Sequence, residues 1–143
     1  MRKALMTAAV VILAGCAQIP PSPQEIADKK FEPVPGKAVV YVVQGAVGQQ
    51  LSAGIEFDDG TQITTWTGTF YRWVTTPGTH TIQNTGALNA SITLQVEAGK
   101  IYFVQQYVSG WRGNVTNSRL QLLDDKTGRM MVSGSSLCCG VNN

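Results

Sequence analysis

The sequence has little of what most enzymes and metal sites need. It contains one histidine, His80, and three cysteines in 143 residues. His80 follows a tight turn among threonines, and no G-x-S-x-G elbow holds a nucleophilic serine, so we expect His80 to be a framework residue. It is also far in sequence from Cys138 and Cys139, which supply only half of a structural zinc set. The sequence therefore predicts a non-enzymatic protein without catalytic residues, metal or cofactor.

An excess of charge of either sign is also missing from the chain after residue 3. The sequence has 11 lysines and arginines and 9 aspartates and glutamates, and Arg2 and Lys3 account for the basic excess. A neutral chain with scattered charges has no electrostatic footprint for nucleic acid and no polybasic patch for anionic lipid. We therefore expect no nucleic-acid partner, and any attachment to a membrane must have another cause.

The two acidic pairs lie where turns are expected. Asp58 and Asp59 precede a glycine between two alternating segments, a pattern typical of a β-hairpin. Asp124 and Asp125 begin a polar stretch that we interpret as a second hairpin loop, followed by a strand over residues 129–133. Neither pair has the spaced carboxylates of a calcium-binding loop.

The apolar run near the N-terminus, residues 4–14, is shorter than the roughly 20 residues of a membrane-spanning helix. It follows a basic start and ends in Leu13-Ala14-Gly15-Cys16. This pattern resembles the lipobox of bacterial lipoproteins. The resemblance implies that residues 1–15 are a signal peptide, that cleavage occurs before Cys16, and that Cys16 is acylated.

Acylation at Cys16 would supply the missing means of attachment. A single acyl chain gives marginal membrane binding, whereas two or three give stable anchoring. Residue 17 is alanine and not the aspartate that resembles an inner-membrane retention signal. The resemblance therefore implies a lipid-anchored protein of the cell envelope, on the periplasmic face of the outer membrane if the host is Gram-negative.

Composition divides the rest of the chain. Residues 17–36 hold five of the six prolines and few large apolar residues, which is typical of an extended tether with room for a short helical turn. From Lys37 onward, β-branched and aromatic runs alternate with glycine-rich turns, and no long helical period appears. We expect a signal peptide over 1–15, a lipidated cysteine and proline-rich tether over 16–36, one domain over 37–133 and a C-terminal tail over 134–143.

The strands expected in this domain are short. Lys37–Val43 is almost continuously apolar and predicts a central strand covered on both faces. Thr76–Thr79 contains Pro77-Gly78 and predicts a type II turn with a positive φ at the glycine. Seven or eight such strands without a helix pattern favour an all-β fold, a single antiparallel β-sandwich, with a small barrel as the alternative.

Short motifs carry a second resemblance, over roughly residues 37 to 130. They are F-D-D-G (57–60), G-T-F-Y-R-W-V (68–74), P-G-T-H-T-I (77–82) and A-G-K-I-Y-F-V (98–104). In this part the chain resembles a family of small bacterial lipoproteins of unknown function and, more loosely, PEGA-type β-sandwich modules. The resemblance implies a β-sandwich framework and an envelope location, and it implies no activity.

The best candidate contact site is Trp111 with Arg112, in a glycine-flanked loop after the longest predicted strand. Tryptophan and arginine are enriched at binding hot spots, so an exposed Trp111 could anchor a protein partner or stack on a sugar. Folded back, the same ring would close one end of the sandwich.

The adjacent cysteines Cys138 and Cys139 lie in a chain expected in an oxidising compartment. Three states are open for them: a vicinal disulfide, a bridge to another chain, or free thiols.

The function predicted from these features is that of a membrane-anchored envelope lipoprotein with a structural or protein-interaction role. The alternative is a glycan-binding module for peptidoglycan or surface polysaccharide, which would use Trp111 and the threonine-rich strands.

Overall fold

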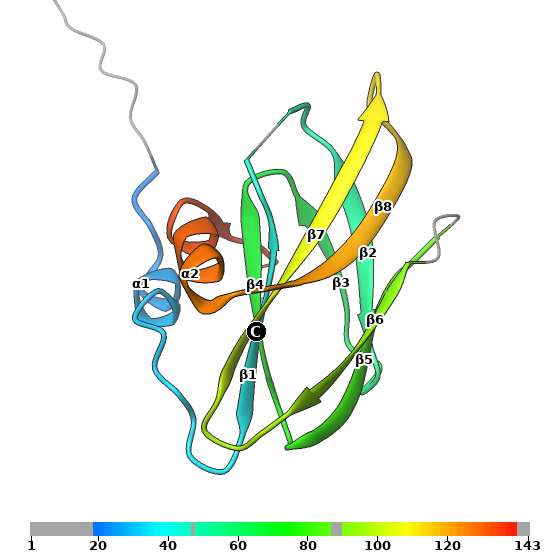
Figure 1. Cartoon of the computed structure of the whole chain (residues 1–143). Helices are drawn as coiled ribbons and strands as arrows, with labels where there is room; N and C mark the ends of the chain where they lie inside the picture. The colour runs from blue at the N-terminus through cyan, green and yellow to red at the C-terminus, as the bar shows by residue number, and fades with distance from the viewer. Residues whose placement is uncertain (1–18, 47, 87–89, 140–143) are drawn as a thin grey trace, which may run out of the picture.

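The computed structural model describes residues 19–46, 48–86 and 90–139. Over these residues the protein is mostly β, with nine strands in two sheets and two helices (Figure 1). Cys16 and the expected signal peptide lie outside the described residues. The elements are α1 (Pro23–Asp28), β1 (Ala38–Gln44), β2 (Ser52–Phe57), β3 (Gln62–Trp66), β4 (Thr69–Thr75), β5 (Gly78–Asn84), β6 (Ser91–Val96), β7 (Ile101–Trp111), β8 (Asn114–Leu123), α2 (Asp125–Ser133) and β9 (Ser136–Leu137).

Strand β1 lies at the centre of a five-stranded sheet of order β8-β7-β1-β4-β9, and the second sheet has the order β3-β2-β5-β6. Most neighbours are antiparallel, but β1 pairs in parallel with β7 and β4 pairs in parallel with β9. The prediction of a purely antiparallel arrangement is therefore wrong. Five strands, β2 to β6, lie between β1 and β7 in the chain. A connection of this length allows two strands to pair in parallel, whereas a hairpin allows only antiparallel pairing.

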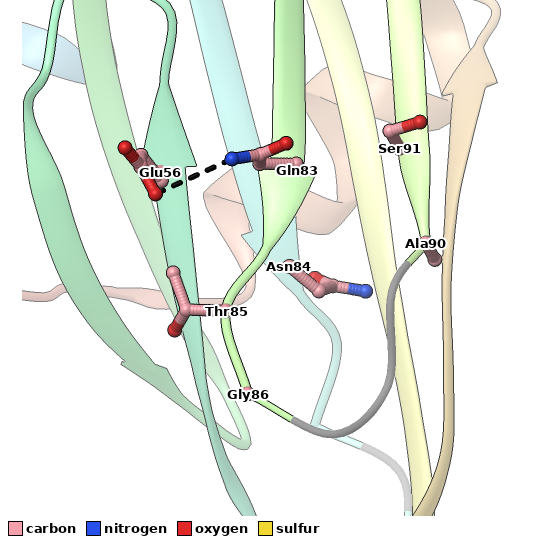
Figure 2. Close-up of a pocket in the computed structure, with 7 residues that line it drawn as sticks. All are labelled: Glu56, Gln83, Asn84, Thr85, Gly86, Ala90 and Ser91. Carbon is pink, nitrogen blue, oxygen red and sulfur yellow. Dashed lines mark hydrogen bonds between the residues drawn. The ribbon is translucent and has the colours of Figure 1, made fainter.

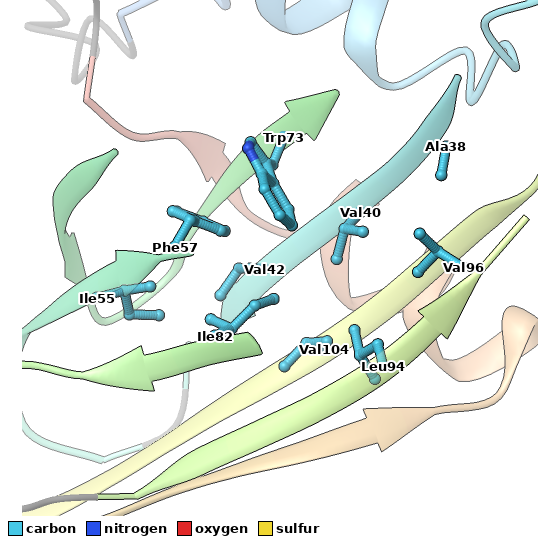
Figure 3. Packing of buried hydrophobic residues seen from close by; sticks show 10 residues of the cluster. All are labelled: Ala38, Val40, Val42, Ile55, Phe57, Trp73, Ile82, Leu94, Val96 and Val104. Carbon is cyan, nitrogen blue, oxygen red and sulfur yellow. The ribbon is translucent and has the colours of Figure 1, made fainter. Parts of the chain in front are cut away.

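The two sheets share an apolar core. Alternate side chains of β1 face this core, together with side chains from β4 and β7 and from three strands of the second sheet (Figure 3). The cluster consists of Ala38, Val40, Val42, Ile55, Phe57, Trp73, Ile82, Leu94, Val96 and Val104. The period-two alternation of the strands produces this core, because residues i and i+2 point to the same face.

The helices cover the other face of the five-stranded sheet (Figure 1). A second buried cluster there consists of Val39, Tyr41, Val43, Phe70, Phe103 and Val132. Every residue of β1 is buried, because one face of the strand meets the second sheet and the other meets the helices. The prediction of a central strand covered on both faces is confirmed.

Helix α1 folds onto the sheet from within the segment expected to be a tether. Ser22 caps the helix, accepting a hydrogen bond from the Glu25 N–H, and Pro23 occupies the first turn, where a proline costs nothing. The Tyr41 hydroxyl donates to the Asp28 carbonyl at 2.6 Å, and the Leu137 N–H donates to the Glu25 carboxylate at 3.1 Å. Residues from both ends of the described chain therefore belong to one folded unit.

Helix α2 replaces the hairpin loop and strand expected over residues 124–133, so that prediction is wrong. The Asp124 side chain accepts a hydrogen bond from the Thr127 N–H at 2.9 Å and so caps the helix, a role for which aspartate is as well suited as for a turn. Gly128, Met131 and Val132 are spaced i, i+3, i+4, the period of a helix face that contacts a core.

The hairpin predicted around Gly60 is present, whereas the type II turn predicted over residues 76–79 is not, because Gly78 already belongs to a strand. Strands β2 and β3 form an antiparallel hairpin around Gly60, which has a φ of 87°. Gly78 has a φ of 139° and begins β5, which confirms the positive φ predicted there. Among the described residues, neither helix has the length and apolar character required to span a membrane.

Candidate functional site

The tip of the β7–β8 hairpin presents Trp111 and Arg112. A two-residue turn joins the strands, and its residues Arg112 and Gly113 have φ values of 51° and 81°, as a type I′ turn requires. Trp111 is 66% exposed, and the Arg112 guanidinium lies 6.0 Å from the centre of its ring. The alternative in which Trp111 closes one end of the domain is therefore excluded.

The same hairpin carries a second aromatic and arginine pair, which sequence reasoning missed. Tyr107 on β7 faces Arg119 on β8, and the guanidinium lies 4.8 Å from the centre of the half-exposed ring. The cross-strand register alone brings the two together, so the pairing could be found only once β7 and β8 are aligned. Arginine and aromatic residues are enriched at protein interfaces, which makes this hairpin the candidate contact surface.

His80 is held by framework groups on both ring nitrogens. Its Nδ1 lies 3.0 Å from the Asp58 carboxylate and its Nε2 lies 2.8 Å from the Thr76 carbonyl. The ring also meets the Trp73 indole edge-on at 5.2 Å between centres. The Thr75 hydroxyl lies 3.3 Å from the same Nε2, so His80 joins the β2–β3 turn to the β4–β5 turn through contacts on both ring nitrogens.

Asp59 holds the same end of the domain. Its carboxylate accepts hydrogen bonds from the Trp73 indole at 2.8 Å and from the Thr61 N–H at 2.9 Å. Burial raises the pKa of this carboxyl, but these hydrogen bonds outweigh burial and leave the pKa below its ordinary value. Asp58 and Asp59 are thus both engaged in holding turns, and no group of three histidine, cysteine or acidic side chains in the described ranges is arranged to hold a metal ion.

Cys138 and Cys139 form a vicinal disulfide, the first of the three states left open by the sequence. Cys138 is buried, and its N–H donates to the Phe70 carbonyl at 2.8 Å. The sulfur of Cys139 lies 3.1 Å from the Thr64 carbonyl on the edge strand β3. The C-terminal segment therefore contacts β4 of one sheet and β3 of the other.

A chain of buried polar side chains crosses the interior, and sequence reasoning did not find it. The Thr65 hydroxyl contacts the side-chain amides of Gln44 and Gln106; the Gln106 amide donates to Asn84 at 2.9 Å, and the Asn84 amide donates to Ser118 at 2.7 Å. Among the described residues, no buried side-chain nitrogen or oxygen lacks a partner. The network therefore joins side chains of the two sheets through hydrogen bonds in the interior.

In comparisons with known proteins, no family model, curated protein or solved structure matches the chain. The lipoprotein and PEGA-type resemblances therefore rest on the motifs of the sequence alone.

Proposed function

We propose that this protein is a lipid-anchored, non-enzymatic protein of the bacterial cell envelope that binds a partner protein. Its two sheets would form the layers of a β-sandwich, and its N-terminal Cys16 would carry the acyl chains. The outer membrane is the proposed location in a Gram-negative host. The lipobox-like N-terminus supports the anchor, and the β7–β8 hairpin supports the interaction.

The observation that carries the interaction is the exposure of Trp111 at the end of the longest strand. A tryptophan side chain left in water forgoes the stabilisation of about 1.5–3 kcal/mol that burial of a large apolar side chain provides. The type I′ turn fixes the backbone next to Trp111, so an interface there would form without ordering a flexible loop. Arg112, Tyr107 and Arg119 supply the planar donors and second ring of a hot spot.

A crosslinking experiment in intact cells tests both halves of the proposal. A photoreactive residue at Asn114, the position across the hairpin from Trp111, should capture a specific envelope protein in cells that express the full chain. The double variant Trp111→Ala/Arg112→Ala should abolish capture while lowering the free energy of unfolding by less than about 1 kcal/mol, compared with the 3–5 kcal/mol typical of a buried tryptophan. A Cys16→Ser variant should take up no labelled fatty acid and should lose the same crosslink.

Leu122→Ala is the matched control, because Leu122 is an exposed apolar side chain of the same hairpin away from its tip. Capture that persists in the Trp111/Arg112 variant would place the interaction elsewhere. Fatty-acid uptake by the Cys16→Ser protein would refute the anchor.

A further inference from the structure

The outer face of the four-stranded sheet is almost uncharged. Successive partners across the ladder share this face, because residues directly opposite one another point the same way. The face, which we call the polar face, consists of Ser52, Gly54, Glu56, Gln62, Thr64, Trp66, Thr79, Thr81, Gln83, Ser91, Thr93 and Gln95. It carries hydroxyls and amides, one carboxylate, one indole and no lysine or arginine.

The polar face is formed mainly by uncharged polar side chains. Lysine, arginine, aspartate and glutamate make up 14% of the chain, so about two charged residues would be expected among twelve positions. The polar face has one, Glu56, and nine hydroxyl or amide side chains. This composition differs from that of a protein interface, where serine is depleted and arginine and methionine are enriched.

Hydrogen bonds between the side chains fix their positions in advance. Thr79 donates to Gln95 at 2.6 Å, Thr81 and Thr93 lie 3.2 Å apart, and Gln83 donates to Glu56 at 3.3 Å. Side chains that are already ordered lose less entropy on binding. Hydroxyls and amides each combine a donor with an acceptor, which is what the hydroxyls of a sugar require.

The Glu56–Gln83 pair lies between two hollows of the surface. One hollow, of about 280 Å³, is bordered by Glu56, Gln83 and Ser91 (Figure 2). The other, of about 250 Å³, is bordered by the same pair and by Asp58 and Thr81. Each hollow is smaller than the roughly 300–1,000 Å³ of a pocket for a drug-sized ligand. Because the two hollows share the Glu56–Gln83 pair, they are placed to hold neighbouring small units of one polymer.

Trp66 supplies an apolar surface at the edge of the same face. It pairs across the ladder with Ser52, and its indole is half-exposed on the outermost strand β3. An aromatic ring beside an array of hydroxyls and amides complements a sugar ring, which has an apolar C–H face and a polar rim.

We propose that the polar face binds a neutral polysaccharide, with Trp66 as the stacking residue and Glu56 and Gln83 as the central hydrogen-bonding pair. The charged groups at the site are the carboxylates of Glu56 and, at one hollow, Asp58, so we expect a neutral polymer to bind better than one that carries carboxylate or sulfate groups. The site lies on the opposite sheet from the β7–β8 hairpin and does not depend on the partner protein proposed above.

Sedimentation of the full chain, purified in mild detergent, with insoluble polymers tests this proposal. The probes are peptidoglycan sacculi, amorphous chitin, amorphous cellulose and, as the anionic polymer, polygalacturonate coupled to agarose beads. We expect binding to at least one of the first three: binding to sacculi alone identifies peptidoglycan as the source, and binding to chitin or cellulose identifies neutral polysaccharide in general. Trp66→Ala, Gln83→Ala and Thr93→Lys should each weaken binding about tenfold or more.

Gln121→Ala is the matched control, because Gln121 is an exposed glutamine on β8 of the other sheet. Thr93→Lys adds a bulky cation at an exposed position and decides the result if Trp66→Ala fails to fold. The proposal is overturned if none of the first three probes is bound, if polygalacturonate is bound more tightly than chitin and cellulose, or if Gln121→Ala weakens binding as much as the variants of the polar face.

Discussion

Gly128 offers a test of how helix α2 lies on the sheet, because two effects of opposite sign act at this position. Alanine is favoured over glycine inside a helix by about 1 kcal/mol, so propensity alone predicts that Gly128→Ala stabilises the protein. The structure predicts the reverse. A Cβ at position 128 would overlap the ring of Phe103 on β7, including an approach of 2.6 Å to its Cδ2.

Phe103 has no room to withdraw. It is buried, stacks on Tyr41 with 5.4 Å between ring centres and meets Phe31 at 5.8 Å. The helix must therefore move outward, and overpacking of this kind costs about 1–3 kcal/mol, occasionally more. Because three atoms of Phe103 would be overlapped, we take the upper end of that range, about 3 kcal/mol, and expect Gly128→Ala to lower the free energy of unfolding by about 2 kcal/mol after the gain of about 1 kcal/mol in propensity.

Urea denaturation measures this difference, and two further variants isolate its cause. Gly134→Ala is the control, because a Cβ there approaches the Met130 carbonyl no closer than 3.6 Å and the residue has a φ of −83°, which alanine adopts readily. Adding Phe103→Leu to Gly128→Ala should recover part of the loss, since residues in contact do not act additively. A Gly128→Ala protein as stable as the unmodified one would refute the close approach of α2 to β7.

Two further predictions concern groups that join distant parts of the chain. His80→Ala should lower the free energy of unfolding by about 1–3 kcal/mol in a urea titration, because it removes the hydrogen bonds to Asp58 and to the Thr76 carbonyl. Thr116→Ala, on an exposed part of β8, should change this free energy little. An equal loss in both variants would contradict the framework role of His80. Burial raises the pKa of Glu25, but hydrogen bonds from Lys29 and from the Leu137 N–H outweigh burial and leave the pKa below its ordinary 4.5. The ionised carboxylate therefore stabilises the fold above pH 4.5, and this stabilisation is lost as the pH falls through the folded-state pKa. Glu25→Gln should therefore show a smaller fall in stability between pH 6 and about pH 3, and an unchanged pH profile would refute the argument.

The sequence was sufficient where the pattern is local. Lys37–Val43 predicted the central strand from its continuous apolar run, and Asp59-Gly60 predicted the β2–β3 hairpin from residues that tolerate positive φ. The loop around Trp111 was predicted in the same way, and the structure places it at the β7–β8 turn. In each case the residues that cause the structure are neighbours in the chain.

The sequence was insufficient where the cause lies elsewhere in the fold. The segment starting at Asp124 suits a turn and a helix cap equally well, and Gly128 favours the turn until Phe103 is known to lie against it. Helix α1 lies in a proline-rich segment whose partners, Tyr41 and Leu137, are remote in sequence. Tertiary contacts therefore determine that both segments form helices.

The same limit applies to the polar face. The alternation of Ser91–Val96 indicates that each strand has a polar side, but the alternation does not reveal which strands are neighbours. Only the order β3-β2-β5-β6 brings Glu56 beside Gln83 and leaves Trp66 on the same side. The register of the sheet thus joins the uncharged outer residues of β3, β5 and β6 with Glu56 of β2 into one surface.

The different surroundings of the two sheets explain why each leaves a different surface for binding. The five-stranded sheet meets the second sheet on one face and the helices on the other (Figure 1). Its β7–β8 hairpin presents the exposed side chains of Tyr107, Trp111 and Leu122. The four-stranded sheet has one face in the shared core, and neither helix joins its outer face in a buried cluster of the described residues. A hairpin tip can enter a pocket of a partner protein, whereas a flat ladder of hydroxyls and amides can follow a polymer. The arrangement would let an anchored protein hold both at once, because the two surfaces share no residue.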